Sequence, residues 1–381
     1  MTLTPSRRTH PTVRFPAEWE SHRATWLAWP HYRDDWPGKF EPIPWVYAEI
    51  IRHLARHERV ELIVNNATNE RNARKVLDRA NALSGNVRFH HWPTDRVWMR
   101  DSGCTFVKCG AGAPARENWK GHDSSRADAV IKKKGSSTPD TRLAIHWRFN
   151  AWAKYQNYKQ DGKIGGLMAK SADAQVLQPI FGKRQVVLEG GSIDSNGHGT
   201  LLTTEECLLS KVQQRNAGMK REDYEKLFSK FLGIKNVIWL GSGIAGDDTH
   251  GHVDDVTRFV APDTVVTAVE SNSDDPNYEP LRENARRLRE ATDHNGKPLA
   301  IVELPMPGPV IFEKRRLPAS YANFYIANGL VLVPVFNDPN DRIALDILAD
   351  LFPDREVVGI YSGDLIWGFG AMHCMTQQQP L

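Results

Sequence analysis

The sequence lacks an apolar run long enough to cross a membrane. Its mean hydropathy is −0.49 over 381 residues, and no window approaches the ~18 uninterrupted apolar residues that a spanning helix needs. The N-terminal segment MTLTPSRRTHPTVRFP has an Arg-Arg pair with no apolar stretch behind it, unlike a secretory signal. These absences exclude an integral membrane protein, and we expect a cytoplasmic location.

An excess of charge of either sign is also missing. Lysine and arginine number 49 and aspartate and glutamate 46, which leaves a net charge of +3. Nucleic-acid binding depends largely on a positive field that neutralises phosphates, and this balance does not supply one. The sequence therefore predicts no nucleic-acid partner and no membrane partner.

Cysteine is scarce, with four residues and no Cys-x-x-Cys pair. This number excludes a disulfide framework and a four-thiolate zinc site. Cys104 and Cys207 lie in apolar, strand-like runs and are expected in the core, and Cys109 is expected at the surface. Cys374 differs, because it follows a glycine-punctuated segment and stands next to His373. A thiolate nucleophile is one interpretation of Cys374, and a small core residue is the other.

What the sequence does have is a repeated helix-turn-strand pattern. Apolar residues at helical spacing precede short apolar strands, and glycine is expected to end the second helix at residues 84–85 and the fourth at Gly233. The pattern predicts an α/β protein, and its recurrence favours a repeat architecture over one doubly wound sheet, although any α/β protein alternates in this way. The expected helices lie near 45–57, 73–83, 163–175, 224–231, 281–288 and 343–351, and the strands are VELIV, VRFHHW, VVLEGG, NVIWL, AIVEL and VVGIY.

The domain organisation follows from the same pattern. We expect residues 1–14 to be an N-terminal tail and residues 15–381 to form a single catalytic domain. The stretch at about 110–146 is rich in small, polar and basic residues. It shows neither the apolar spacing of a helix nor that of a strand, so we interpret it as a surface insertion.

Four loops that follow strands carry polar residues that a fold alone does not need. They contain Asp101, Glu189, His252 and Cys374, and the interval from His252 to Cys374 is about twice that from Glu189 to His252. Equivalent loops of successive repeats would give such spacing. If the repeats surround an axis, these loops converge on one pocket, which is where an enzyme would place its site.

The segment His250-Gly-His252-Val-Asp254 admits a metal site, since His-x-His-x-Asp can bind one divalent ion. No further histidine follows a strand with a partner carboxylate at ligand spacing, so we expect no metal. In an extended segment residues 252 and 254 share one face, which favours an acid/base histidine beside an anionic binding residue.

The expected pocket collects carboxylates, among them Asp101, Glu189 and Asp254. Such a cluster repels itself unless a cation neutralises it, and with a metal disfavoured the candidate is a cationic substrate. A guanidinium is planar and forked, so it matches carboxylates that accept paired hydrogen bonds, and its carbon stays open to a thiolate. Carboxylates that simply cap glycine turns remain the alternative.

At this point several ordered motifs resemble one family. The chain is similar to agmatine deiminases and the related bacterial peptidyl-arginine deiminases of the guanidino-group modifying superfamily. The resemblance covers all but the first dozen residues and the insertion. Its motifs are FPAEWESHRATWLAWP, DRVWMRDSG, RFNAW, LEGGSIDSNGHGTLLTTEECLLS, GDDTHGHVDD, ANFYIANGLVLVPVFNDPNDRIALDIL and GAMHCMTQQQP.

The resemblance implies a five-bladed α/β propeller (pentein) of ββαβ units with pseudo-fivefold symmetry. Up to six helix-strand units are counted above, so one of them must be misassigned. The resemblance also implies a hydrolase with no cofactor and no metal, acting on a small-molecule guanidino substrate. A homodimer is left open.

The same resemblance implies the residue roles. Cys374 would attack the guanidinium carbon, His252 would act as general acid and base, and Glu189 would orient His252. Asp101 and Asp254 would hold the guanidinium nitrogens. Trp98 would line the site, and Arg96, Arg148 and Asn150 are further candidates for substrate binding.

The sequence departs from agmatine-specific relatives at positions that bear on the substrate. Those relatives commonly carry an acid at Arg96, a proline at Cys104, Gly-Gly where this chain has Ala153-Lys154, and asparagine at Ala371. Agmatine is expected first, with free or peptide-linked arginine as the alternative if Arg96 or Arg148 meets its carboxylate; arginines that face solvent are equally open. A non-catalytic guanidino-binding protein and a zinc hydrolase are less favoured.

Overall fold

The computed structural model describes residues 13–109 and 142–381. Most of the expected N-terminal tail and of the expected insertion lie outside the described residues. The insertion was expected to run to about 146, but Leu143–Ile145 form the buried strand β6, which pairs with β5 and β7. The three-residue strand was too short to show a period beside the polar stretch.

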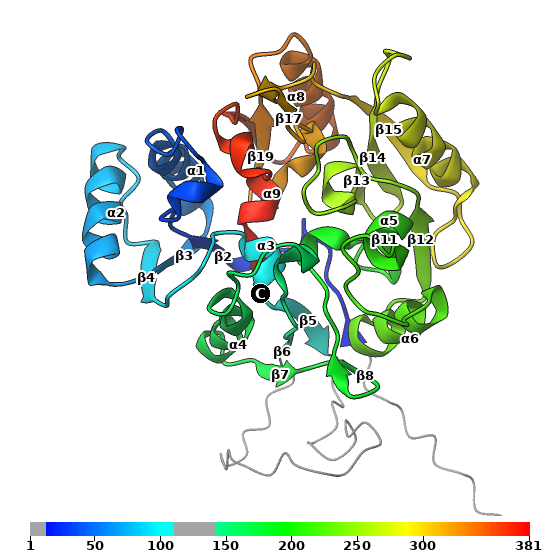
Figure 1. The fold of residues 1–381 in the computed structure, drawn as a ribbon, viewed down its shortest axis with the longest axis horizontal. Helices are drawn as coiled ribbons and strands as arrows, with labels where there is room; N and C mark the ends of the chain where they lie inside the picture. The colour runs from blue at the N-terminus through cyan, green and yellow to red at the C-terminus, as the bar shows by residue number, and fades with distance from the viewer. Residues whose placement is uncertain (1–12, 110–141) are drawn as a thin grey trace, which may run out of the picture.

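The described strands form five sheets of three or four strands and two two-stranded hairpins. In each of the five sheets an antiparallel pair is followed by a parallel strand that the chain reaches through a helix. An α/β architecture is therefore confirmed. The sheets lie around a centre, and the short helices α3 and α9 lie close to it (Figure 1).

One four-stranded sheet joins β2, near the start of the described chain, to its last strand. Its strands are β2 (His22–Ala28), β3 (Arg59–Val64), β4 (Val87–His91) and the C-terminal β21 (Gln377–Pro380), in the order β21-β2-β3-β4. The second contains β1 (Val13–Arg14), β5 (Thr105–Cys109), β6 and β7 (Gln175–Leu177).

The other three sheets are three-stranded. They are β10 (Asp194–Ser195), β11 (Thr200–Thr204) and β12 (Asn236–Leu240); β13 (Thr257–Ala261), β14 (Thr264–Val269) and β15 (Ala300–Pro305); and β18 (Tyr325–Ala327), β19 (Leu330–Val335) and β20 (Glu356–Tyr361). The hairpins are β8 (Ile180–Phe181) with β9 (Arg184–Gln185) and β16 (Ile311–Phe312) with β17 (Arg315–Arg316).

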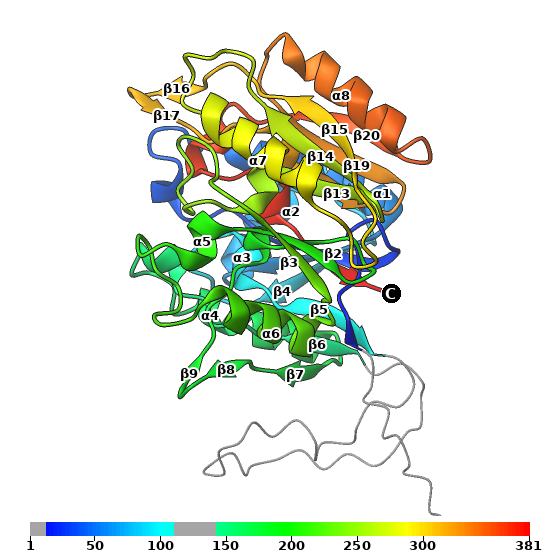
Figure 2. The same ribbon diagram turned by 90° about the vertical axis from the view of Figure 1, so that its right-hand side faces the viewer.

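The helices that connect these strands bury one apolar face each. The long ones are α1 (Ile43–His57), α2 (Ala67–Arg79), α4 (Asp161–Ser171), α6 (Arg221–Leu232), α7 (Tyr278–Glu290) and α8 (Asn340–Leu351). Figure 2 shows α7 lying in front of β14, and α7 contacts both β14 and β12. The short ones are α3 (Met99–Ser102), α5 (Glu205–Leu209), α9 (Met372–Met375) and the 3-10 turns η1 (Arg33–Asp35), η2 (Ala151–Ala153), η3 (Gly190–Ser192), η4 (Val253–Asp255), η5 (Tyr321–Asn323) and η6 (Leu365–Gly368).

Five of the six expected helix-strand units occur, and one of the six was misassigned, as expected. The sheet β21-β2-β3-β4 takes two of them, α1-β3 and α2-β4, and their strands are parallel neighbours. One strand assignment does need correction: α4 leads to β7 rather than to VVLEGG, whose residues 190–191 lie in η3.

The helix ends differ in one case. Gly233 ends α6 in the left-handed conformation with φ 71°, as expected. The second helix instead ends at Arg79, and the residue with positive φ is Asn81 (φ 53°), not Gly85. Asparagine can adopt this conformation, and the apolar residues beyond Arg79 continued the helical period past its true end.

The cysteines also correct two expectations. Cys104 is buried as expected, but Cys109, expected at the surface, is 2% exposed at the end of β5, where Val13 of β1 pairs with it. Cys207 is buried on helix α5, not on a strand. Among the described residues no helix is both long and apolar enough to span a membrane.

Candidate active site

The four polar loops converge as their spacing predicted. Asp101 lies on α3, Glu189 immediately precedes η3, His252 immediately precedes η4, and Cys374 lies on α9. Each comes from a different sheet unit, and α3 contacts α9 while η3 contacts η4. All four side chains are at least 95% buried.

His252 is the centre of the cluster. Its Nδ1 lies 3.9 Å from carboxylate oxygens of Asp101 and Asp254, and its Nε2 lies 3.9 Å from Glu189. Burial opposes a charge on the ring, but Asp101, Cys207 and Glu189 outweigh it and hold the pKa of His252 well above its ordinary value. The imidazole is therefore protonated at neutral pH and able to donate a proton.

Glu189 is held as an anion. The Nε of Arg215 lies 3.2 Å from its Oε1, and both side chains are fully buried. Burial raises the pKa of Glu189, but the Arg215 guanidinium and His252 outweigh it and lower the pKa to about 2. Glu189 can therefore stabilise a protonated His252 over the whole physiological pH range.

Cys374 lies between an amide and a carboxylate. The Nδ2 of Asn323 donates to its Sγ at 3.1 Å, and Sγ lies 3.6 Å from the Oδ2 of Asp254. Burial and the carboxylates of Asp254, Asp255 and Asp101 raise the pKa of the Cys374 thiol well above its ordinary value. The site therefore holds a thiol until a positive charge arrives beside it.

The carboxylate of Asp101 is positioned by a turn with an unusual backbone conformation. Its carboxylate accepts hydrogen bonds from the Nε1 of Trp152 at 2.8 Å and from the backbone N–H of Gly191 at 3.0 Å. Residues 151–153 all have positive φ, between 50° and 58°, which is costly for residues other than glycine. The Oδ1 of Asn150 accepts from the N–H of Ala153 across this turn and helps to hold it.

Asp254 is held from the opposite side by a chain of buried charges. The Nδ1 of His373 lies 2.6 Å from its Oδ2, and the Nε2 of His373 lies 2.9 Å from Glu18. Glu18 in turn contacts Arg100 at 3.1 Å and Arg258 at 3.0 Å. Burial raises the pKa of Asp254, but His373 outweighs it, and the net direction is downward. Asp254 is therefore an anion in a fixed position.

Two groups in this site have metal-ligand atoms within 4.8 Å of one another: Glu189 with Cys207 and His252, and Asp254 with Asp255 and Cys374. The first of the two histidines in His-x-His does not join them, because the Nε2 of His250 lies 3.1 Å from Ser210. His250 and His252, which together suggested a zinc site, therefore do not meet at one site, and only His252 belongs to one of the two groups.

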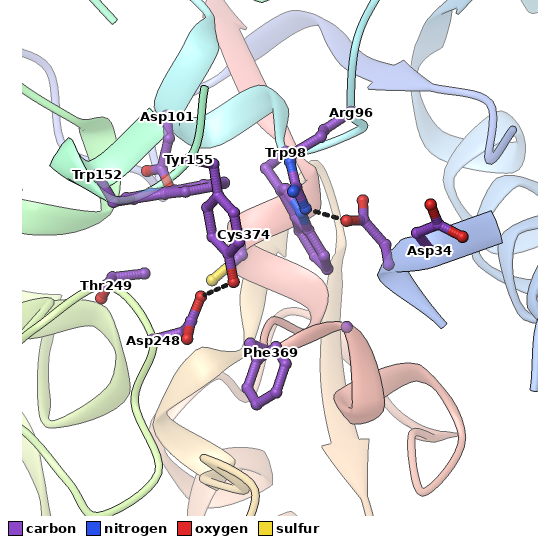
Figure 3. A pocket seen from close by; sticks show the side chains of 12 residues that line it. Asp34, Arg96, Trp98, Asp101, Trp152, Tyr155, Asp248, Thr249, Phe369 and Cys374 are labelled. Atoms are coloured by element: carbon purple, nitrogen blue, oxygen red, sulfur yellow. Dashed lines mark hydrogen bonds and ion pairs between the residues drawn. The ribbon is translucent and has the colours of Figure 1, made fainter. Parts of the chain in front are cut away.

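A pocket opens onto Cys374 and Asp101. The side chains around its mouth, with Trp98 on one side of Cys374 and Asp248 on the other, are seen in Figure 3. Gly370 permits this packing, since a Cβ there would lie 2.6 Å from the Trp98 ring and 3.0 Å from the Cys374 Cβ. The lining comprises Asp34, Asp35, Arg96, Trp98, Asp101, Trp152, Tyr155, Asp248, Thr249, Gly368, Phe369 and Cys374. The pocket thus combines aromatic walls with several carboxylates, which suits an organic cation.

Residues 14–380 match the family model described as Porphyromonas-type peptidyl-arginine deiminase. The chain belongs to this family. The resemblance inferred from the motifs is therefore confirmed over nearly the whole chain.

Two kinds of relatives agree with this. The agmatine deiminase of Pseudomonas aeruginosa strain LESB58 is 34% identical over 96% of this chain and 95% of its own. The solved agmatine deiminase of Enterococcus faecalis is 27% identical, with a TM-score of 0.80 over 97% of this chain and 96% of that one. An agmatine deiminase of C. jejuni with substrate bound is 26% identical, with a TM-score of 0.79 over 100% and 98%.

Of the other three residues that were expected to bind substrate in this member of the deiminase family, only one lines the pocket. Arg96 lines the pocket, where its guanidinium contacts Asp35 and lies 4.1 Å from the centre of the Tyr155 ring. Arg148 is exposed and does not line the pocket, so the expectation that it binds substrate there is not met. Asn150 does not line it either; its side chain accepts a hydrogen bond from Ala153 in the turn that carries Trp152.

Several residues of the site were not anticipated, although their neighbours were. His373 was noted only as the residue beside Cys374, and Trp152 only as part of RFNAW. Glu18 and Asn323 gave no signal beyond their presence in family motifs, and Arg215 lies outside those motifs. Their roles depend on contacts between distant segments, which a single sequence does not reveal.

Proposed function

We propose that this chain hydrolyses agmatine to N-carbamoylputrescine and ammonia through a covalent intermediate on Cys374. The observation that carries the proposal is the placement of Asp101 and Asp254 beside both His252 and Cys374. Two fixed carboxylates next to a thiol and a protonated imidazole suit a guanidinium, which needs both a binding partner and a nucleophile.

The substrate supplies the charge that activates the nucleophile. The carboxylates raise the pKa of Cys374, and a guanidinium bound to Asp101 and Asp254 neutralises them and adds a positive charge beside the sulfur. Both effects favour the thiolate. The thiol proton is then lost to solvent only when substrate is present, because His252 is already protonated, and this limits side reactions of the cysteine.

The reaction then proceeds in two halves. The thiolate attacks the guanidinium carbon, the new C–S bond gives a tetrahedral adduct, and His252 donates a proton to the leaving nitrogen as the C–N bond breaks and ammonia departs. The remaining thiouronium is attacked by water, which gives one proton to His252 and forms a second tetrahedral adduct. The C–S bond breaks as the adduct's hydroxyl proton is lost to solvent and the C=O bond forms, and the ureido product and the Cys374 thiolate are released.

Agmatine is favoured over arginine by the charge of the pocket. Its lining contains four aspartates, Asp34, Asp35, Asp101 and Asp248, against one cation, Arg96. A second positive charge on the substrate suits this anionic lining, where Lys154 and Arg315 already contact Asp248. The guanidinium of Arg96 is engaged by Asp35, so it is not poised to receive the carboxylate of arginine.

The five sheets support a wider proposal for the architecture. Each repeats an antiparallel pair, a helix and a parallel strand, and they surround the centre where α3 and α9 lie (Figure 1). We propose that they are the blades of a five-bladed propeller with pseudo-fivefold symmetry, that residues 15–381 are its single catalytic domain, and that neither a metal nor a cofactor takes part.

The test is an endpoint assay of purified protein for ureido product and ammonia. Agmatine, free arginine and a peptide ending in arginine are offered to the wild type, to Cys374→Ser and, as a matched control, to Cys109→Ala. Preferred turnover of agmatine that is lost in Cys374→Ser and kept in Cys109→Ala is expected. Preference for arginine or the peptide would overturn the assignment of substrate, and full activity of Cys374→Ser would overturn the mechanism.

A further inference from the structure

Asp248 joins three segments at the mouth of the pocket. It lies in the loop between β12 and η4, and its Oδ2 accepts a hydrogen bond from the hydroxyl of Tyr155 at 2.5 Å. The ammonium of Lys154 contacts its Oδ1, and the guanidinium of Arg315 on β17 lies 3.3 Å from the same oxygen. Asp248 and Cys374 line the same pocket, and Figure 3 shows the hydrogen bond between Tyr155 and the Asp248 carboxylate.

Lys154 stands out among these partners because of its chemistry. A primary ammonium on a flexible alkyl chain is also what the distal end of agmatine presents. Lys154 places that group on a carboxylate that lines the substrate pocket. The Lys154 side chain is 36% exposed, so it can leave Asp248 for solvent without uncovering buried structure.

We propose that Lys154 determines substrate specificity by competing with the distal ammonium of the substrate for Asp248. This inference rests on the proposed function, because it concerns the tail of a guanidino substrate whose head lies between Asp101 and Asp254. A dicationic substrate must displace Lys154 or bind without that contact. A guanidino substrate with an uncharged tail meets no such competition.

The surrounding charges set the size of the effect. Asp35 is engaged by Arg96, and Arg315 stays on Asp248 when Lys154 leaves. Arg315 is 50% exposed, and contacts of exposed charges are weak. Removing Lys154 is therefore expected to increase the negative charge felt by the substrate tail without changing the reacting groups. The removal of Lys154 is therefore expected to lower the KM for agmatine and to leave kcat unchanged.

The test compares agmatine with n-butylguanidine, which has the same guanidinium and an uncharged tail. The variants are Lys154→Met, Lys154→Arg to keep the charge, and Lys159→Met as a control that removes an exposed lysine of the same loop. We expect Lys154→Met to raise the ratio of kcat/KM for agmatine to that for butylguanidine by about 3- to 10-fold, through a lower KM for agmatine. Lys154→Arg and Lys159→Met should keep the wild-type ratio.

The outcomes separate this inference from the proposed function. If the wild type turns over neither compound, the proposed function fails. If it turns over either one and the ratio in Lys154→Met equals that in Lys159→Met, or falls below it, competition by Lys154 is refuted while the deiminase assignment stands.

Discussion

At the scale of single residues, the ionisation of Cys374 controls what the site can do. Burial and three carboxylates favour the thiol, whereas the amide of Asn323 is the neighbour that favours the thiolate. The same amide donates to Asp255 at 2.8 Å, and its oxygen accepts from the N–H of His373 at 3.0 Å. Asn323 thus fixes the position of the nucleophile as well as its charge.

Asn323→Ala removes a hydrogen bond that stabilises the thiolate. The pKa of Cys374 rises further, so a higher pH is needed to form the thiolate, and the ascending limb of kcat/KM against pH should move upward by about one unit. The measurement is the pH profile of agmatine turnover, with thermal unfolding as a check on the fold. A limb that stays in place or moves to lower pH would contradict this description of the thiol.

At the scale of elements, the turn η2 shows how a local distortion serves a distant group. Three consecutive residues with positive φ place the Trp152 indole on Asp101. Asn150 closes the turn by capping Ala153. Arg148, two residues earlier, is exposed and outside the pocket.

Asn150→Ala should therefore loosen the turn and misplace Asp101. Loss of a capping side chain costs about 1 kcal/mol of stability, and misplacement of a binding carboxylate should raise the KM for agmatine roughly 10-fold. Steady-state kinetics and denaturant unfolding measure the two effects.

Arg148→Ala is the matched control for that prediction, since it alters the same segment without touching the turn. It should leave both KM and stability unchanged. If it raised KM as much as Asn150→Ala does, Arg148 would have to contact substrate, and the position of the pocket would be wrong.

At the scale of the whole molecule, a buried charge network ties distant parts of the chain to the site. Glu18 lies between β1 and β2, and it contacts Arg100 on α3, Arg258 on β13 and His373 on α9. His373 in turn contacts Asp254, which lies in the site. The ends of the described chain and its middle therefore depend on one carboxylate.

Glu18→Gln leaves Arg100 and Arg258 buried without their shared anion. Breaking a buried pair in this way typically costs 3–5 kcal/mol, and the free energy of unfolding from denaturant titration should fall by about that amount. Glu279→Gln, which breaks the exposed pair of Glu279 with Arg282, is the control and should be indistinguishable from wild type. Equal stability of the two variants would show that the network is not a structural element.

The parts that were predicted from the sequence are those set by local pattern. Helix-strand units follow from apolar spacing, and the convergence of the loops with Asp101, Glu189, His252 and Cys374 follows from their recurrence. The burial of Cys109, the role of Asn150 and the Glu18 network were not predicted, because each depends on which distant segments meet. The pairing of Arg96 with Asp35 belongs to the same class, since neither residue signals the other.

The central claim is that Cys374 becomes covalently bound to the substrate carbon. The most direct measurement is the mass of the Cys374 peptide from enzyme that is acid-quenched while it turns over agmatine, beside the same peptide from Cys374→Ala. We predict a wild-type adduct with the mass of agmatine less one ammonia, and neither adduct nor ureido product from Cys374→Ala. Product formation by Cys374→Ala at the wild-type rate, with no adduct on the wild type, would contradict covalent catalysis by this cysteine.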